Sequence, residues 1–305
     1  MDSWTLVYEG FEPEQEPLRE ALCTLGNGYF ATRGASAQAD ADGTHYPGTY
    51  LAGGYNRLKT EIAGRVIENE DLVNLPNWLV LKFRVEDGPW FAVKDAEILK
   101  YRQELRMKEG LLAREIRFRH DQGRVTVLRE RRLVHMGNPH LAGLETTVTA
   151  DNWSGRVEFE SGLDGRVIND GVARYRELNN RHLEPLETDE IDHDTVFLKV
   201  QTNQSELRIA QAARTAVFKN GESLRLNRLL IQEADYVAQR FTVDLSEGRA
   251  VRVEKIVALH TSRDHASSEC GLEAGKTVRR CQSFENLVKS QSHAWRRLWR
   301  RFAMT

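Results

Sequence analysis

Apolar and polar residues alternate with a period of two along most of the chain between Val73 and Leu259. Ile116 and Phe118, for example, are separated and flanked by charged residues. The same alternation recurs at Val125 and Val127, Val157 and Phe159, Val196, Leu198 and Val200, Phe241, Val243 and Leu245, and Val251 and Val253. Successive side chains of a β-strand point to opposite faces, so this pattern predicts strands with one face on a core and the other in water.

Short turn sequences separate the predicted strands. They include Glu86-Asp87-Gly88-Pro89, Gly137-Asn138-Pro139, Lys219-Asn220-Gly221-Glu222 and Ser246-Glu247-Gly248. Because parallel strands need crossovers of about a dozen residues, strands joined by such short turns are expected to pair antiparallel. No segment between Val73 and Leu259 has the pattern of a long amphipathic helix. So many strands exceed one flat sheet, and the sequence therefore predicts an all-β fold, a large antiparallel sandwich of two packed sheets.

The pattern changes after about Ser262, where a segment near the end of the sequence has a helical period. Its stripe of mostly apolar residues consists of Leu287, Gln291, Trp295, Leu298, Trp299 and Phe302, at steps of three and four. Two tryptophans and a phenylalanine on one stripe need burial, and the sequence leaves two ways to provide it. This C-terminal amphipathic helix either docks onto the sandwich or links it to a further domain.

The charge balance argues against nucleic acid and membrane partners, despite the arginine pairs of this helix. The chain has 43 Lys and Arg against 45 Asp and Glu, so it has no general attraction to anionic polymers or surfaces. No window approaches the roughly 18 apolar residues of a membrane span, and the N-terminus lacks the features of a signal peptide. Cys23, Cys270 and Cys281 show no Cys-x-x-Cys spacing and are expected to be reduced thiols. A cytoplasmic protein is therefore expected.

Four short motifs resemble ligand sites but do not meet the requirements of one. The stretch from Gly271 to Thr277 resembles a phosphate-binding loop, yet it is one residue short between its glycines and follows no apolar strand. Gly26-Asn27-Gly28 has no third glycine at the spacing of a dinucleotide-binding turn. Asp192-His193-Asp194, or His260 with His265, offer metal ligands, but neighbouring strand residues point to opposite faces. We therefore expect no cofactor and no metal, and solvated or core polar roles for these residues.

Glu160 and Asp164 form one candidate pair of catalytic carboxylates, because glycoside cleavage uses two acids. They stand in Glu160-Ser161-Gly162-Leu163-Asp164-Gly165, a sequence that is also typical of an ordinary turn. The pattern does not separate the two roles, and turn acids are much the more common.

A series of sequence blocks follows between Leu25 and Asn169, and the first three are rich in glycine, asparagine and aromatic residues. They are Leu25 to Gly34 (LGNGYFATRG), Tyr50 to Asn56 (YLAGGYN), Leu72 to Leu79 (LVNLPNWL), Tyr101 to Arg114, Glu130 to Val134, His140 to Ala142, and Ser161 to Asn169. In this order they resemble the N-terminal region of glycoside hydrolase family 65. That family includes maltose, trehalose and kojibiose phosphorylases and related α-glucoside hydrolases. Ala31, Gly54 and His135 depart from the family pattern and leave the subfamily and substrate open.

The resemblance implies a β-supersandwich over residues 1–265 and the start of a helical linker over residues 266–305. In the family, the linker leads to an (α/α)₆ barrel with the general acid and, in phosphorylases, the phosphate site. No stretch of this chain matches that barrel, so no catalytic residue is assigned and the chain alone is expected to be inactive. The implied parent enzyme acts on an α-linked glucose disaccharide with inversion, by hydrolysis or with inorganic phosphate as co-substrate. A homodimer is implied as well.

The same resemblance suggests residues for the rim of the parent's active site and for domain contact. The rim candidates are Asn27, Arg33, Asn56, Asn74, Asn77 and Trp78, since amides and indoles suit sugar hydroxyls and faces. The alternative is that the asparagines fix loop backbone and Trp78 fills the core. The candidates for contact with the following domain are Trp295, Leu298, Trp299 and Phe302.

Two further functions stay open at this point. One is a freestanding carbohydrate-binding or scaffold protein, which would bind sugar without turning it over. The other is a self-sufficient enzyme that uses Glu160 or Asp164.

Overall fold

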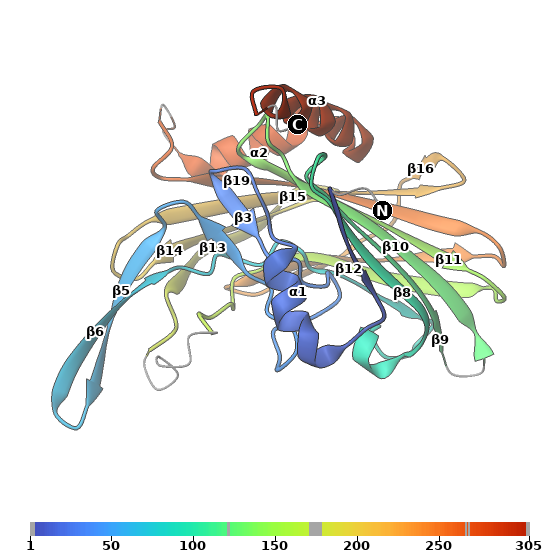
Figure 1. Cartoon of the computed structure of the whole chain (residues 1–305), viewed down its shortest axis with the longest axis horizontal. Coiled ribbons are helices and arrows are strands. Elements are labelled where there is room, and N and C mark those ends of the chain that lie inside the picture. Colours follow the sequence, from blue (N-terminus) through green and yellow to red (C-terminus); the bar gives the residue numbers. More distant parts are fainter. Residues whose placement is uncertain (1–3, 121–122, 171–178, 266, 268, 303–305) are drawn as a thin grey trace.

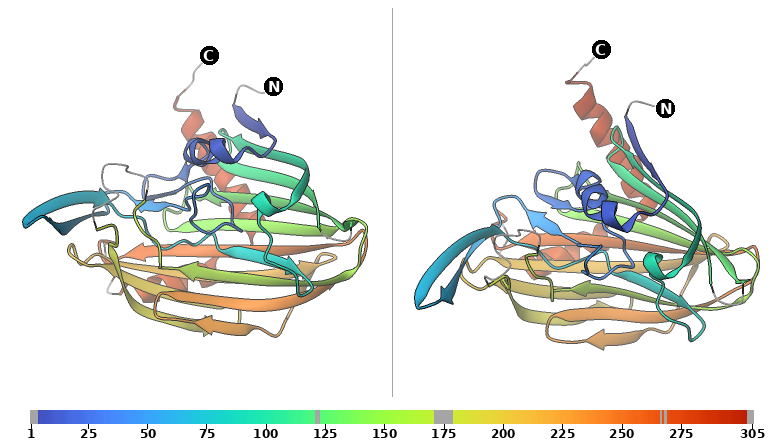
Figure 2. Two further views of the ribbon diagram at one scale, coloured as in Figure 1. Left: turned by 90° about the horizontal axis from the view of Figure 1, so that it is seen from below. Right: turned by 60° about the horizontal axis from the view of Figure 1, so that its bottom comes forward.

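The computed structural model describes residues 4–120, 123–170, 179–265, 267 and 269–302. Its main body is built from two antiparallel sheets that face each other (Figures 1 and 2). The larger sheet has ten strands. Nine follow in the order β1 (Thr5–Glu9), β8 (Glu97–Arg106), β9 (Leu111–Arg119), β10 (Val125–Val134), β11 (Leu141–Ala150), β19 (Ala250–Thr261), β15 (Arg208–Lys219), β14 (Thr195–Thr202) and β13 (Leu183–Asp192), and β16 (Glu222–Leu224) pairs with the end of β15.

The second main sheet has four strands, and two small sheets accompany the body. The four strands follow in the order β17 (Leu229–Gln232), β18 (Tyr236–Leu245), β12 (Gly155–Asp164) and β7 (Leu81–Val85). The small sheets are β2 (Leu25–Gly26), β3 (Phe30–Thr32) and β4 (Thr49–Leu51), and the hairpin β5 (Tyr55–Ile62) and β6 (Arg65–Leu72). The hairpin projects from one end of the body (Figures 1 and 2).

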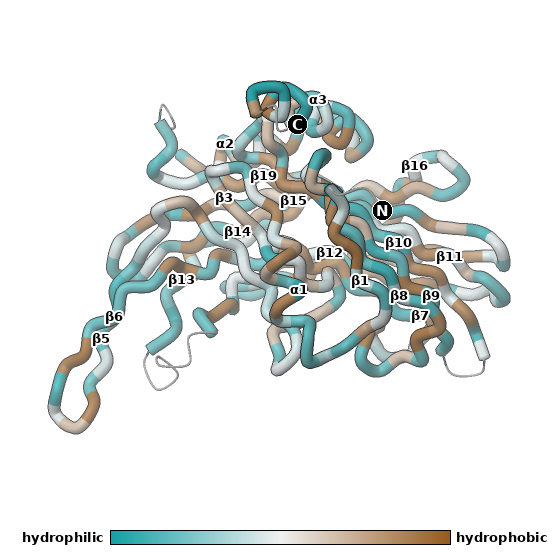
Figure 3. The backbone as a smooth tube through the Cα atoms, viewed as in Figure 1, coloured by the Kyte–Doolittle hydropathy of each residue, from teal (hydrophilic) through white to brown (hydrophobic). Residues whose placement is uncertain are grey.

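The core lies between the facing surfaces of the two main sheets. Phe83 of β7 and Phe159 of β12 come from the smaller sheet, with ring centroids 6.1 Å apart. Phe118 of β9 comes from the larger sheet and lies 6.4 Å from Phe83. All three rings are fully buried, and burial of each contributes about 1.5–3 kcal/mol. Figure 3 shows hydrophobic and hydrophilic residues alternating along the strands, and the predicted all-β, antiparallel fold is confirmed.

Two helices, α2 (Cys270–Arg280) and α3 (Phe284–Trp299), cover part of the outer face of the larger sheet (Figure 1). They belong to a second buried cluster, on the side of the sheet away from the main core. Its members are Leu111, Leu133, Leu141, Phe197, Ala210, Ala212, Ile256, Ala258, Cys270, Ala274, Val278, Phe284 and Leu287. Both helices begin at a capping side chain: Glu269 accepts from the amide of Leu272, and Ser283 from that of Asn286. The predicted C-terminal helix is confirmed as α3.

The remaining helices are short and lie near the N-terminus or in a strand connection. They are α1 (Glu16–Leu22) and the 3₁₀ turns η1 (Pro13–Gln15) and η2 (Val93–Asp95). Among the residues described between Val73 and Leu259, helical backbone is limited to η2 and Gly123, so no long helix interrupts the strands, as the sequence predicts. No helix in the described ranges is long and apolar enough to cross a membrane.

Candidate functional site

The first block of the family pattern, Leu25 to Gly34, is here called the glycine-rich motif, and it forms the tight turn between β2 and β3. Gly28 has φ of +87°, a conformation that favours glycine. The Asn27 side chain holds this turn from both ends. Its Oδ1 accepts from the amides of Tyr29 and Phe30, at 2.9 and 3.1 Å, and its Nδ2 donates to the carbonyls of His135 and Pro139, at 3.0 and 2.9 Å. Asn27 therefore fastens the motif to the turn that precedes β11.

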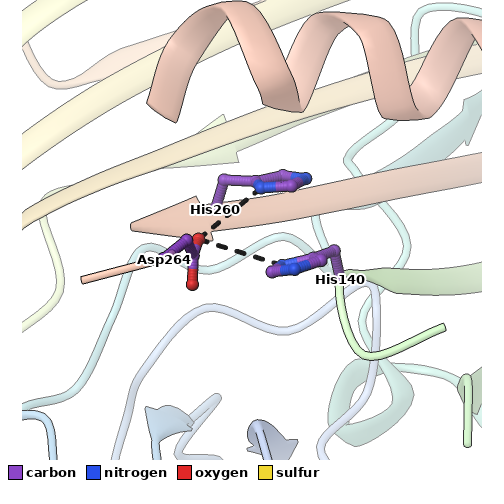
Figure 4. Close-up of side chains that lie close together, drawn as sticks. All are labelled: His140, His260 and Asp264. Atoms are coloured by element: carbon purple, nitrogen blue, oxygen red, sulfur yellow. Dashed lines mark ion pairs between the residues drawn. The ribbon is translucent and has the colours of Figure 1, made fainter. Parts of the chain in front are cut away.

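The side chains of His140, His260 and Asp264 lie close together (Figure 4), and Tyr29 of the motif reaches this polar cluster with its hydroxyl. Its hydroxyl lies 2.7 and 2.9 Å from the two Asp264 carboxylate oxygens. His260 Nδ1 lies 3.5 Å from Asp264 Oδ2, and the rings of His140 and His260 stack at 3.8 Å and 10°. We name these four residues the Tyr29 cluster. It joins the motif, the start of β11, the end of β19 and the segment that leads to α2.

The Tyr29 cluster places a carboxylate beside a histidine whose pKa is lowered. Burial, and then the adjacent His260, lower the pKa of His140, whose Nδ1 donates to the Leu259 carbonyl at 2.9 Å. Burial alone would raise the pKa of Asp264, but hydrogen bonds from His260, the Thr261 amide and Tyr29 outweigh it and lower that pKa. Asp264 is therefore ionised at neutral pH, and His140 is uncharged there.

The Tyr29 cluster contains side chains that bind metals, but its geometry does not suit an ion. One donor atom each from His140, His260 and Asp264 falls within 4.8 Å of the others. An imidazole binds a metal along a lone pair in the plane of its ring. Parallel stacked rings direct these lone pairs side by side rather than at one point, and His140 Nδ1 already donates a proton to Leu259. We therefore interpret the cluster as a hydrogen-bonded lock between loops.

The metal-ligand motifs considered from sequence are arranged differently in the structure. His260 is grouped with His140 and Asp264 rather than with His265. Asp192 ends β13, and its Oδ2 accepts from Arg279 Nε at 2.7 Å. The stretch from Gly271 to Thr277 lies inside α2, so no phosphate loop exists there.

Asn56, the rim candidate on β5, is 1% exposed and serves a neighbouring turn. Its Oδ1 accepts from the amides of Gln204 and Ser205, at 3.2 and 2.8 Å. Its Nδ2 lies 2.8 Å from Asn203 Oδ1 and 3.1 Å from His182 Nδ1. The amide therefore has partners within the protein on both its oxygen and its nitrogen.

The other rim candidates also make internal contacts. Asn74 Oδ1 accepts from the Thr49 amide at 3.0 Å, and Asn77 Oδ1 from the Leu79 amide at 2.9 Å. Trp78 is 1% exposed, and its indole donates to the Thr32 hydroxyl at 2.9 Å.

Arg33, the remaining rim candidate, is held by backbone carbonyls. Its Nε donates to the Tyr46 carbonyl at 3.1 Å, and its Nη2 donates to the Pro17 carbonyl at 3.0 Å. The structure thus gives each of the six rim candidates a role in the fold, and their role toward sugar stays a prediction.

The carboxylates of Glu160 and Asp164 are each paired with an arginine. Glu160 Oε2 accepts from Arg240 Nη2 at 2.6 Å, and its Oε1 accepts from the Tyr236 hydroxyl at 2.6 Å. Asp164 accepts from Nε and Nη2 of Arg166, both at 2.9 Å. Both carboxylates thus have partners within the protein, as in ordinary structural ion pairs.

The aromatic stripe of α3 divides into a docked part and an open part. Trp299 contacts Trp4 with ring centroids 4.8 Å apart, and its Nε1 donates to the Lys108 carbonyl at 3.1 Å. Trp295 stacks on Trp299 at 5.5 Å. Leu298 is half-buried, whereas Phe302 is 64% exposed. Both tryptophans thus pack against the sandwich or against each other. Contact of the stripe with a further domain stays a prediction.

Sequence reasoning missed His140 and Asp264. They are separated from Tyr29 by more than one hundred residues, and neither belongs to a motif with His260. The one signal in the sequence was the high content of glycine, asparagine and aromatic residues around Tyr29. It indicated a constrained loop but not which residues contact it.

The fold and these contacts define an all-β class, a two-sheet β-supersandwich whose glycine-rich loops are fixed from within. The chain belongs to glycosyl hydrolase family 65: the model of the family's N-terminal domain matches residues 6–298. A candidate kojibiose phosphorylase from the human microbiome has the same fold, with a TM-score of 0.83 at 18% identity over 97% of this chain and 38% of that one. The predicted family and supersandwich are confirmed.

Curated relatives are much longer than this chain. A Mycobacterium tuberculosis (strain H37Rv) protein described as an uncharacterized glycosyl hydrolase is 41% identical over 303 residues, 99% of this chain and 23% of that protein. The kojibiose phosphorylase of Halothermothrix orenii is 26% identical over 97% of this chain and 37% of its own length. The trehalose 6-phosphate phosphorylase of Lactococcus lactis subsp. lactis is 28% identical, with 97% and 36% covered.

Proposed function

We propose that this chain is the noncatalytic part of a longer family 65 enzyme that cleaves an α-glucosidic disaccharide with inversion. The family match over residues 6–298 carries this proposal, together with relatives of which the chain spans only 23% to 37%. Two of these relatives are named as disaccharide phosphorylases. In phosphorolysis a general acid protonates the glycosidic oxygen while inorganic phosphate attacks the opposite face, and in hydrolysis water takes that place.

Within such an enzyme, the domain would support the catalytic barrel, take part in a homodimer and contribute loops to the active-site rim. The exposed Phe302 at the end of α3 supports the barrel contact. The internal bonding of the rim candidates supports rigid presentation of their loops. A cytoplasmic location belongs to the same proposal and is supported by Cys23, Cys270 and Cys281, which are all unpaired.

Turnover by the purified chain tests the proposal. Maltose, trehalose and kojibiose are each incubated with and without inorganic phosphate, and glucose and glucose 1-phosphate are measured. We expect neither product from this chain, and product from a longer protein in which the chain is followed by a family 65 barrel. Turnover by this chain that is lost in Asp164→Asn would overturn the proposal. Micromolar binding of one disaccharide without turnover, measured by titration calorimetry, would favour the freestanding carbohydrate-binding alternative.

A further inference from the structure

The hairpin β5–β6 is a projecting arm whose base is anchored to the body and whose strand edges have no backbone partner among the described residues. It extends from the body in each view of Figures 1 and 2, and its register runs from Tyr55 opposite Leu72 to Ile62 opposite Arg65. Among the described residues, no backbone-to-backbone hydrogen bond joins either strand to the body over this register. Side chains attach the arm instead, since Asn56 Oδ1 accepts from the Ser205 amide at 2.8 Å and the Thr60 hydroxyl accepts from the Asn179 amide at 2.9 Å. An isolated two-stranded hairpin is only marginally stable in water, so an arm of this length favours a partner.

The turn of the arm determines which backbone groups face its free edges. Ala63 and Gly64 have φ of 51° and 76°, as in a two-residue type I′ turn. In such a turn the flanking residues form a hydrogen-bonded pair, and hydrogen-bonded pairs then recur at every second position. Thr60 and Ile62 therefore bond inward to β6, whereas Lys59 and Glu61 direct their N–H and C=O groups to the free edge of β5.

The two faces of the arm differ in character. One face carries cross-strand charge pairs, such as Arg57 opposite Glu70. The other, here called the apolar face, also carries Thr60 and Asn69, and its apolar residues run from Leu58, which is 5% exposed, to Ile62 and Ile67, which are 36% and 42% exposed. Figure 3 shows hydrophobic residues near the tip of the arm. Its apolar face therefore continues beyond the part that the protein body covers.

We propose that two copies of this chain pair through the free edges of their β5 strands, antiparallel about a twofold axis at Thr60. In this register Lys59 faces the partner subunit's Glu61, and Leu58 faces the partner subunit's Ile62. The residues directed outward supply about four backbone hydrogen bonds, and each opposite-charge pair adds stabilisation. The result is a four-stranded ribbon that covers Ile62 on its apolar face, with the closed symmetry typical of homodimers.

Charge selects this register over its neighbours. A shift of two residues in either direction places Lys59 or Glu61 opposite itself, which is unfavourable for like charges. The free edge of β6 directs Val66, Glu68 and Glu70 outward. If two β6 edges paired about a twofold axis at Glu68 or Asn69, glutamates would face one another. An axis at Ile67 would give no pair of opposite charges. The β5 edge is therefore the self-complementary one.

This inference assigns an interface to the homodimer of the proposed function, and it rests only on the proposal that the protein is a homodimer. Its test is sedimentation velocity of the 305-residue chain over a range of concentrations. Glu61→Lys sets a second lysine opposite Lys59 twice per dimer and should raise the dimer Kd about tenfold. The double variant Lys59→Glu/Glu61→Lys should restore the dimer, and Glu247→Lys, in an exposed turn of the body, is the control of equal charge change.

A cysteine test then reads the register directly. Thr60 faces its own copy in a non-hydrogen-bonded pair with Cα atoms about 4.5 Å apart, which a disulfide can span. Thr60→Cys should therefore give a covalent dimer on oxidation, whereas Lys59→Cys, offset by two residues, should not. A chain that stays monomeric at every concentration overturns the inference, as does a dimer whose Kd is unchanged by Glu61→Lys. A covalent dimer of the variant Ile67→Cys would place the interface on β6 and overturn it as well. Disaccharide turnover is measured separately, so the proposed function survives each of these failures.

Discussion

Lys255 lies on β19 and is completely buried between the two main sheets. Its Nζ donates to the carbonyls of Val80 and Gly162, at 2.8 and 2.5 Å, which connects the larger sheet to the smaller one and to the segment before β7. Among the described residues, no carboxylate forms an ion pair with it. A charged amine held only by carbonyls is costly in an apolar interior, and burial lowers the pKa of Lys255 well below its usual value.

Lys255→Met is expected to change how the free energy of unfolding depends on pH. Between the lowered folded-state pKa and the unfolded value near 10.4, the unfolded chain binds the extra proton, so wild-type stability rises with pH. The gain is about 1.4 kcal/mol for each unit by which the folded pKa is lowered. Urea unfolding at about pH 6, 8 and 9.5 should show the wild type gaining on the variant as pH rises. Parallel curves would contradict the prediction.

The Tyr29 cluster should make the protein sensitive to mild acid. Because the pKa of His140 is lowered by burial and by His260, the unfolded chain takes up a proton first as the pH falls below about 6.5, and stability declines. His140→Phe keeps an aromatic ring beside Tyr29 and His260 but does not titrate. Its free energy of unfolding should fall less than that of the wild type between about pH 7 and 5. His293→Gln, on the exposed face of α3, should follow the wild type.

Single residues also show where prediction from the sequence reaches its limit. The glycine-rich motif indicated that Asn27 is constrained. Its contacts match the role of fixing loop backbone, which the sequence offered as the alternative to a place on the active-site rim. Its other partners, the carbonyls of His135 and Pro139, are 108 and 112 residues away. Such contacts depend on which strands lie side by side, and local sequence carries no information about that.

At the scale of elements, α3 depends on a glycine to approach the larger sheet. Gly110 has φ of +58°, and a Cβ added there would lie 2.1 Å from Nε1 of Trp295. Gln291 also donates to the Gly110 carbonyl, at 3.1 Å. The contact between α3 and the β8–β9 turn thus leaves no room for a side chain at this position.

Gly110→Ala is therefore expected to displace Trp295 and to destabilise the protein by about 1–3 kcal/mol. Chemical unfolding measures the loss, and a red shift of tryptophan emission reports the displaced ring. Gly221→Ala is the matched control, because Gly221 has φ of +85° but no atom within 4 Å of the added Cβ. It shares the backbone strain without the clash, so equal losses in the two variants would rule out the proposed contact.

The elements differed in how well their sequences reveal them. Strands with one face in the core alternate visibly, and α3 buries the large residues Phe284 and Leu287. By contrast, α2 buries Cys270, Ala274, Gly275 and Val278 and leaves Leu272 61% exposed, so no large apolar side chain marks its buried face. A short helix such as α1, of seven residues, has too few turns to establish a period.

At the scale of the whole molecule, the two main sheets bring distant parts of the chain together. In the larger sheet β11 pairs with β19, with Leu141 opposite Ala258, and β1 pairs with β8. The alternation predicts which face of each strand is buried but not which strands are neighbours. The helices α2 and α3 then cover part of the outer face of the larger sheet (Figure 1). Phe302, just beyond α3, stays exposed to solvent.

Trp299 and the exposed Phe302 separate the two roles of α3 in one experiment. Trp299 contacts Trp4 and the Lys108 carbonyl but is only half-buried, so Trp299→Ala should destabilise this chain by less than the loss of about 3–5 kcal/mol at a core position. Phe302 is 64% exposed, and Phe302→Ala should leave the free energy of unfolding within about 0.5 kcal/mol. In a longer protein with a following barrel, Phe302→Ala should lower stability because the ring would there be buried between domains. Equal stability of that longer variant and its parent would show that Phe302 faces solvent in both.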